Sequence, residues 1–177
     1  QVTASEITSI DALEAPKAIE IDVLPAGDEA REPYEGMLVR PTGAYTVTNN
    51  YTLNTYGELG LAPGERAHRT PTDVVAPGAP AAELQAKQDA EVVYLDDGRT
   101  KDYFRTDKHT PLPYIVTSEG GVKSIRTGDQ VDFQTDVVVD YSFDQWRFQP
   151  LQPITGKNAA EDLPITWDDS RKAAYDT

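Results

Sequence analysis

Short stretches rich in β-branched, aliphatic and aromatic residues follow one another along the first half of this chain. Residues 19–23 alternate apolar and charged side chains, and further stretches of this kind lie at 36–40, 44–49 and 56–61. Pro, Gly and Asn residues separate them, as expected for consecutive strands joined by turns. The pattern therefore predicts short β-strands in this half of the chain.

The second half continues the β pattern after one helical stretch. Residues 80–89 contain mainly good helix formers after Pro80, and they predict the one clear helix. Further strands are predicted at 91–95, 131–141 and 145–149. In the last of these, Trp146 and Phe148 share a face. Residues 99–130 form a long polar connection between strands.

Many short strands, one small helix and frequent turns predict a mainly β fold, namely a small OB-fold-like Greek-key barrel with long loops. We expect residues 1–30 to be an N-terminal linker with a possible extra strand, and residues 31–154 to form the barrel. Residues 155–177 are expected to be a C-terminal linker toward a catalytic domain outside this chain. The chain opens with Gln1, so we interpret it as a piece of a longer protein.

The charge of the chain is strongly negative, with 16 Lys and Arg against 30 Asp and Glu and a net charge of -14. Domains that bind nucleic acid through phosphates are usually basic, so any such contact here requires a local basic patch. The chain has no Cys and no apolar run long enough to span a membrane. Neither observation decides the compartment.

Six motifs occur in a fixed order between residues 31 and 153. They are Tyr34-Glu35-Gly36-Met37-Leu38-Val39, Asn50-Tyr51-Thr52-Leu53-Asn54-Thr55-Tyr56-Gly57-Glu58-Leu59, Leu95-Asp96-Asp97-Gly98-Arg99, Arg126-Thr127-Gly128-Asp129, Asp140-Tyr141-Ser142-Phe143 and Trp146-Arg147-Phe148-Gln149-Pro150.

This motif series resembles the OB-fold-like module of large bacterial extracellular nucleases, which precedes a catalytic domain of the endonuclease/exonuclease/phosphatase superfamily. The resemblance implies a secreted or cell-surface protein whose parent is an endonuclease dependent on Mg²⁺, Mn²⁺ or Ca²⁺. The catalytic domain of the same polypeptide would be the partner of this module, with DNA or RNA as a further partner. Residues 167–171 are similar to the linker into that domain, whereas Thr55 stands where the family often has a basic residue. The catalytic motifs of the superfamily are not in this chain.

The best candidate for nucleic-acid binding is the stretch of residues 99–109, where basic groups surround two adjacent aromatic rings. Single-strand binding combines cations for the phosphates with rings on which bases stack. A second stacking and cationic pair follows near the end of the chain. The candidate residues are Arg99, Lys101, Tyr103, Phe104, Arg105, Lys108, Trp146 and Arg147.

Each of these candidates also has a plainer interpretation. Residues 99–109 could be a solvated loop whose rings pack on the barrel, and Trp146 could belong to the core. Tyr45, Tyr51 and Tyr56 could line a binding face or could pack inside. The whole chain could also be an acidic protein-interaction or spacer module that binds no nucleic acid.

The sequence offers no catalytic or metal-binding site of its own. The aspartates near residues 96–102 and 140–144 could hold Ca²⁺, but they match no complete loop signature and suit turns equally well. His68 and His109 lack metal-ligand spacing, and Ser142 lacks a His/Asp partner pattern. We therefore expect a module that is not itself catalytic and holds no cofactor.

Overall fold

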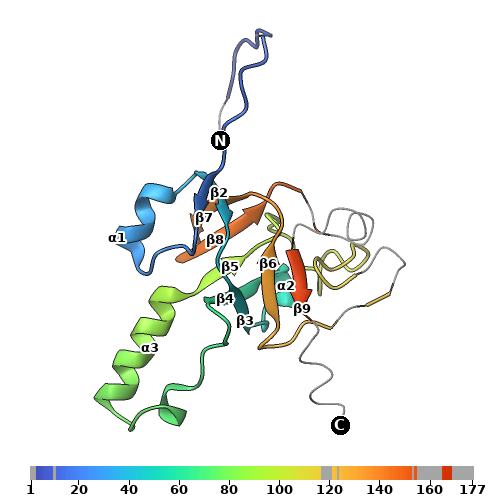
Figure 1. Cartoon of the computed structure of the whole chain (residues 1–177). Coiled ribbons are helices and arrows are strands. Elements are labelled where there is room, and N and C mark those ends of the chain that lie inside the picture. The colour runs from blue at the N-terminus through green and yellow to red at the C-terminus, as the bar shows by residue number, and fades with distance from the viewer. Residues whose placement is uncertain are drawn as a thin grey trace.

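A computed structural model gives the fold of the chain, shown in Figure 1. It describes residues 3–9, 11–116, 121–122, 124–152 and 154, together with the backbone of residues 165–168. The mainly β class is confirmed. The strands are β1 (Ile19–Ile21), β2 (Leu38–Pro41), β3 (Tyr45–Asn49), β4 (Leu59–Pro63), β5 (Val93–Leu95), β6 (Gln130–Phe133), β7 (Val137–Ser142), β8 (Gln145–Pro150) and β9 (Ile165–Asp168).

The helices are short, apart from one. They are α1 (Asp28–Arg31), α2 (Leu53–Tyr56) and α3 (Ala79–Glu91), with 3-10 turns at Glu32–Tyr34 and Pro71–Asp73. The helix predicted at residues 80–89 is confirmed as α3. In Figure 1 α3 projects away from the sheet.

The strands form one mixed sheet in the order β1-β2-β7-β8-β5-β4-β3-β6-β9. Neighbours are antiparallel except for the pairs β1–β2 and β5–β8, which are parallel. β1 and β9 stand at the two ends of this order, so the described sheet is not closed into a ring. β7 lies between β2 and β8, so it is an interior strand of the sheet.

Three aromatic rings show that the sheet is strongly curved. Tyr45, Phe133 and Phe148 lie on β3, β6 and β8, and each pair of rings packs edge to face at centroid distances of 5.5–5.7 Å. In a flat sheet β8 and β3 would be about 14 Å apart, because two strands separate them. The sheet must therefore fold over so that the two strands face each other.

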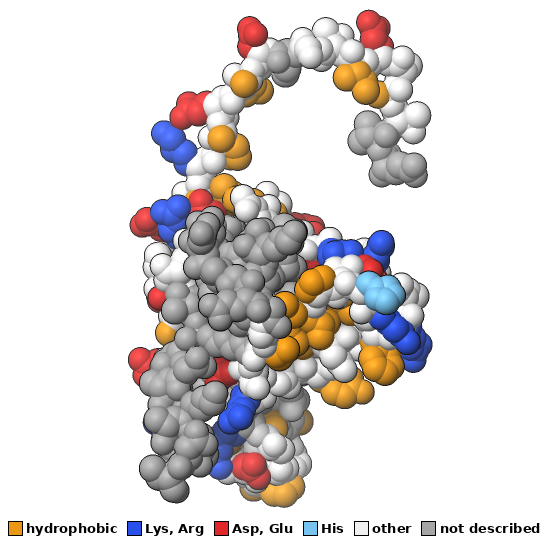
Figure 2. All heavy atoms as spheres, turned by 90° about the vertical axis from the view of Figure 1, so that its right-hand side faces the viewer, with side chains coloured by type: hydrophobic (Ala, Val, Ile, Leu, Met, Phe, Trp, Pro, Cys, Tyr) orange, Lys and Arg blue, Asp and Glu red, His pale blue; other side chains and the backbone are white. Residues whose placement is uncertain are grey.

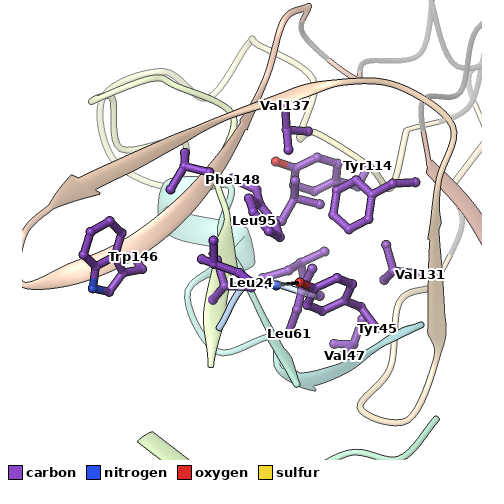
Figure 3. Close-up of a cluster of buried hydrophobic side chains, with 14 of the residues drawn as sticks. Leu24, Tyr45, Val47, Leu61, Leu95, Tyr114, Val131, Val137, Trp146 and Phe148 are labelled. Atoms are coloured by element: carbon purple, nitrogen blue, oxygen red, sulfur yellow. Dashed lines mark hydrogen bonds between the residues drawn. The ribbon is translucent and has the colours of Figure 1, made fainter. Parts of the chain in front are cut away.

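The core lies inside this curved sheet, as Figure 3 shows. Tyr45 is buried at its centre, and its hydroxyl oxygen accepts a hydrogen bond from the Leu24 backbone N–H at 2.8 Å. Burial raises the pKa of this hydroxyl far above its ordinary value. Val131 and Phe133 are buried while Asp132 between them is exposed, so the alternation seen in the sequence is the inside–outside pattern of β6.

Two predicted strands differ from the structure. Residues 131–141 read as one strand, but the chain breaks after Phe133 into β6 and β7, which pair with different neighbours. The strand expected at 56–61 begins only at Leu59, because Tyr56 ends α2. Most of the expected linker at 155–177 lies outside the described residues, although β9 pairs with β6.

Arg31 ties α1 to the end of α3. Its buried guanidinium donates to the backbone carbonyls of Pro25 at 2.6 Å, Val92 at 2.8 Å and Glu91 at 2.9 Å. The last carbonyls of a helix have no partner within the helix, so a buried cation at this position satisfies them and opposes the negative end of the helix dipole. Burial lowers the pKa of Arg31.

Candidate nucleic-acid interface

The loop of residues 99–109 contains a tight turn that hydrogen bonds to Asp102 stabilise. The Asp102 carboxylate accepts hydrogen bonds from the backbone N–H groups of Phe104 at 2.9 Å and Arg105 at 2.8 Å. Its carbonyl oxygen accepts from the N–H groups of Thr106 and Asp107. Bonds of this kind are those by which aspartates fix tight turns. Phe104 is therefore held in one backbone geometry at the head of the turn.

Tyr103 anchors this turn to the sheet. Its side chain is buried, its N–H donates to the Thr55 carbonyl at 2.9 Å, and its hydroxyl donates to the Asp97 carboxylate. Burial, with the Asp97 hydrogen bond and charge, raises the pKa of the Tyr103 hydroxyl. Burial also raises the pKa of Asp97, although the bond from Tyr103 acts in the opposite direction. The loop is thus joined to α2 on one side and to the end of β5 on the other.

Phe104 and the cations around it point to solvent. Phe104 is 64% exposed, and Lys101, Arg105 and Lys108 are exposed as well. These four residues are called the loop surface below. Residues 99–109 lie at the right of Figure 1, the side that faces the viewer in Figure 2, where hydrophobic side chains lie beside Lys, Arg and His side chains. Within the described residues no carboxylate pairs with Lys101 or Lys108.

Arg99 has a structural part in the same loop. Its guanidinium pairs with Asp107 at 2.8 Å and lies 5.6 Å from the centroid of the Tyr103 ring. Asp107 also accepts a hydrogen bond from the Thr110 hydroxyl at 2.8 Å. These contacts close the base of the loop, so Arg99 supports the loop surface more than it extends it.

Two further tyrosines are exposed, Tyr56 at the end of α2 and Tyr51 in the turn before α2. Tyr51 is 86% exposed, and Tyr56 is partly exposed next to Thr55, the residue to which Tyr103 bonds. Of the three tyrosines considered from the sequence, only Tyr45 packs inside. The sequence contains a signal for the exposure of Tyr51, because this residue follows Asn49-Asn50, a pair typical of turns.

Trp146 and Arg147 lie apart from the loop and are buried. The Trp146 indole N–H donates to the Asp28 carboxylate at 2.8 Å. The side chain of Arg147 is 2% exposed and pairs with Glu58 at 2.5 Å and with Asp96. Burial acts to lower the pKa of Arg147, but its hydrogen bonds and charge contacts with the two carboxylates raise it. Neither side chain is placed to contact a ligand directly.

The aspartates considered as calcium ligands are used in turns. Asp96 accepts from the Gly98 N–H at 2.7 Å, and Asp97 accepts from the Arg99 N–H at 2.9 Å. Burial raises the pKa of Asp96, against the opposing effects of Gly98 and Arg147. In the part of the chain that the structure describes, no group of three or more His, Asp or Glu side chains is arranged to hold a metal ion.

Comparisons with protein-family models, with curated proteins and with solved structures find no match to this chain. Among the described residues, no helix combines the length and the apolar character needed to cross a membrane.

Proposed function

We propose that this chain is a non-catalytic, OB-fold-like domain of a secreted nuclease. In this proposal its loop surface holds single-stranded nucleic acid for a metal-dependent phosphodiesterase domain in the same polypeptide. The Mg²⁺, Mn²⁺ or Ca²⁺ ion would belong to that domain. The resemblance of the six sequence motifs to such a module supports the nuclease, its secretion and its metal.

The strand pairing supports the OB-like architecture. β3, β4, β5, β8 and β7 are neighbours in this order, with β5 and β8 parallel. β2 pairs with β7 and is separated from β3 by only residues 42–44. If β2 and β3 are two halves of one bent strand, five strands enclose the core as a partly open Greek-key barrel. The contact of Tyr45 with Phe148 across the core agrees with this closure.

The observation that carries the proposed role is the pairing of a buried anchor with an exposed ring. Tyr103 fixes the loop, and Phe104 beside it presents its ring among three exposed cations. A ring that a rigid turn holds at the surface offers a stacking platform to an unpaired base. The cations Lys101, Arg105 and Lys108 would contact the phosphates on either side of that base.

Binding of a fluorescent oligothymidine at low salt, measured by anisotropy, tests this role. Phe104→Ser should weaken binding about tenfold, because stacking on one ring is worth roughly 1–3 kcal/mol. Replacing Lys101 and Lys108 with Ser should flatten the dependence of affinity on salt, since two phosphate contacts are lost. Phe143→Ser is the matched control, because this exposed ring lies in another turn and should leave the affinity unchanged. Absence of binding by the unmodified chain would remove the nucleic-acid role.

The second candidate function is an acidic protein-interaction or spacer module. The net charge of -14 favours it, because this charge repels a polyanion everywhere except at a local basic patch. This candidate predicts no oligonucleotide binding even at low salt, so the same titration separates the two functions.

A further inference from the structure

Three carboxylates share one buried cation at the place where the loop of residues 99–109 joins the sheet. Arg147, whose side chain is 2% exposed, pairs with Glu58 at 2.5 Å and with Asp96. The third carboxylate, Asp97, follows Asp96 in the turn after β5 and is half-buried. Glu58, Asp96 and Asp97 are called the carboxylate centre below. When all three are ionised, three negative charges face one positive charge, and the centre carries excess negative charge.

Asp97 is the member of this centre with which no cation pairs in the described part of the chain. Its carboxylate accepts hydrogen bonds from two neutral donors, the Tyr103 hydroxyl and the Arg99 backbone N–H at 2.9 Å. The Arg99 guanidinium pairs with Asp107 instead, at 2.8 Å. A carboxylate that is partly removed from water and lacks a cation is the group that most readily takes up a proton.

Three segments of the chain close around Asp97. Gly57 ends α2 so near to it that an added Cβ would lie 2.9 Å from Asp97 Oδ2 and 2.8 Å from Pro113 Cγ. The buried Tyr103 reaches the same carboxylate from the loop. Tyr114, which follows Pro113, is also buried, and the charge of Asp97 raises the pKa of its hydroxyl after the larger effect of burial. The carboxylate of Asp97 therefore lies between α2, the loop and residues 113–114.

The pKa of Asp97 agrees with this geometry. Burial raises it, the hydrogen bonds from Tyr103 and Arg99 act in the opposite direction, and the charge of Asp96 raises it further, so that the pKa lies above the ordinary value of an aspartate. Opening of the loop would return the carboxylate to water and lower this pKa. Protonation therefore favours the closed loop, in which Tyr103 is bonded to Asp97. Closure is strengthened as the pH falls through the pKa of Asp97 and is weakened as the pH rises through it.

Other titratable groups lie in the loop itself. The carboxylate of Asp102 accepts backbone N–H groups of the turn, and that of Asp107 pairs with Arg99. His109 is exposed at the end of the loop, and histidines gain positive charge in mildly acidic solution. A change at Asp97 alone separates its contribution from theirs, because these groups are the same in the variant and in the unmodified chain.

We propose that Asp97 is a proton-operated latch for the loop surface. In mildly acidic solution one proton from the solvent neutralises its carboxylate, and the remaining carbonyl oxygen still accepts the hydrogen bond from Tyr103. The protonated form holds the loop closed and removes a charge that repels phosphates, so the loop surface binds single-stranded nucleic acid more tightly as the pH falls. By linkage, nucleic-acid binding also promotes the uptake of this proton. The effect on nucleic acid rests on the proposed function, whereas proton uptake and loop closure do not.

Two measurements on the unmodified chain test the latch without a ligand. In a ¹³C NMR titration of the side-chain carboxyl groups, Asp97 should titrate at a higher pH than an aspartate in an unstructured peptide. The ring signals of Tyr103 should shift in the same transition. Hydrogen exchange, expressed as protection factors, should show that the amides of residues 103–107 become severalfold better protected between about pH 7.5 and about pH 4.5.

A variant at Asp97 tests the effect on binding. Asp97→Asn removes the charge but keeps an oxygen that accepts the Tyr103 hydroxyl, so the loop should be well protected at both pH values. Its affinity for the fluorescent oligothymidine should rise about twofold in neutral solution, an effect expected of one charge about 10 Å from a phosphate. Asp132→Asn is the matched control, because it removes the same charge from an exposed position on β6. This control should keep the pH dependence of the unmodified chain.

Three results would overturn the proposal. They are titration of Asp97 at or below the pH of an ordinary aspartate, loop protection that does not rise as the pH falls, and the same pH dependence of oligothymidine affinity in Asp97→Asn and the unmodified chain. If Asp97→Asn does not fold, the first two measurements still decide. Failure of the proposed function gives a different result, namely no oligothymidine binding at any pH while the carboxyl titration and the loop protection change as expected.

Discussion

The loop surface and the tip of the β7–β8 hairpin, made of Phe143 and Asp144 and called the hairpin surface below, each expose a phenylalanine beside a buried residue, but they differ in the charge around the ring. Phe104 follows the buried Tyr103 and lies among Lys101, Arg105 and Lys108. Phe143 has φ of 54°, lies over the buried Arg147 and is followed in the same turn by the exposed Asp144. In Figure 1 the loop lies at the right of the sheet and the β7–β8 turn at the left. The two exposed rings of this small domain therefore lie in surroundings of opposite charge.

The difference shows that net charge is a poor guide to a single surface. A chain of charge -14 should repel a polyanion, yet the loop surface carries three exposed cations next to Phe104 in the sequence, of which, within the described residues, only Arg105 lies near a carboxylate, Asp102 at 4.0 Å. Charges interact over roughly 8 Å at physiological salt, so a local cluster can act against the average field. Near Phe143 the single cation, Arg147, is already paired with Glu58 and Asp96. The local charge there therefore has the same negative sign as the net charge of the chain.

The largest expected effect comes from Arg147, since this buried cation pairs with Glu58 and Asp96 and lies against the Phe143 ring. Arg147→Met should cost about 3–5 kcal/mol of unfolding free energy, because it leaves Glu58 and Asp96 as poorly hydrated charges without a partner. Urea denaturation measures this loss. Arg105→Met is the matched control, and this exposed residue should change stability by less than about 0.5 kcal/mol.

A further variant shows whether the loss of unfolding free energy comes from the unpaired carboxylates of Glu58 and Asp96. Adding Glu58→Gln and Asp96→Asn to Arg147→Met should restore part of the stability, because the buried charges are removed together with their partner. If Arg147→Met alone costs less than about 1 kcal/mol of unfolding free energy, the ion pairs of Arg147 with Glu58 and Asp96 do not stabilise the hairpin. Arg147 would then not be the residue that holds the Phe143 ring in place.

A change at Gly57 should affect the loop surface more than the hairpin surface, because an added Cβ would meet Pro113 and Asp97, and Asp97 anchors Tyr103 of the loop. Gly57 ends α2 with φ of 72°, and an added Cβ would come within 2.8 Å of Pro113 Cγ and 2.9 Å of Asp97 Oδ2. Gly57→Ala should therefore cost about 3 kcal/mol, from backbone strain together with overpacking. Hydrogen exchange should show faster opening of residues 99–109 and little change in the β7–β8 hairpin.

Gly36→Ala is the control for backbone strain. Gly36 has φ of 74°, but an added Cβ there meets nothing within 4 Å. This variant should lose about 1–2 kcal/mol, from strain alone. Equal losses in Gly36→Ala and Gly57→Ala would mean that the packing of Asp97 and Pro113 against Gly57 does not hold the loop.

The sequence predicts the strands well because their signal is local. In β6 the alternation of side chains matches burial, and the good helix formers after Pro80 identify α3. In β8 the alternation places Trp146 and Phe148 in the core, but Arg147 between them is buried as well. The break between β6 and β7 was not predictable in this way. Residues 131–141 are apolar on both sides of the break, and only pairing with different strands separates them.

The candidate site is harder to predict, since its geometry depends on distant residues. Arg147 has the residue type of a phosphate ligand, but its partners Glu58 and Asp96 lie 89 and 51 positions away in the sequence. Tyr103 and Phe104 are adjacent and similar, and only the bonds of Tyr103 to Thr55 and Asp97 determine which ring is buried. Residue types locate the loop, whereas the fold decides which of its members meet solvent.

The smallest expected effect has the opposite sign and belongs to the hairpin surface. Phe143→Asn should stabilise the chain by about 0.5 kcal/mol, because relief of roughly 1 kcal/mol of backbone strain exceeds the loss of a solvent-exposed cation–π contact worth about 0.5 kcal/mol. Thermal unfolding measures this gain. Phe104→Asn, at a position without positive φ, should give no gain. A stability gain would mean that the Phe143 ring does not contribute to the stability of the hairpin. A stability loss would show instead that the ring over Arg147 serves the hairpin itself.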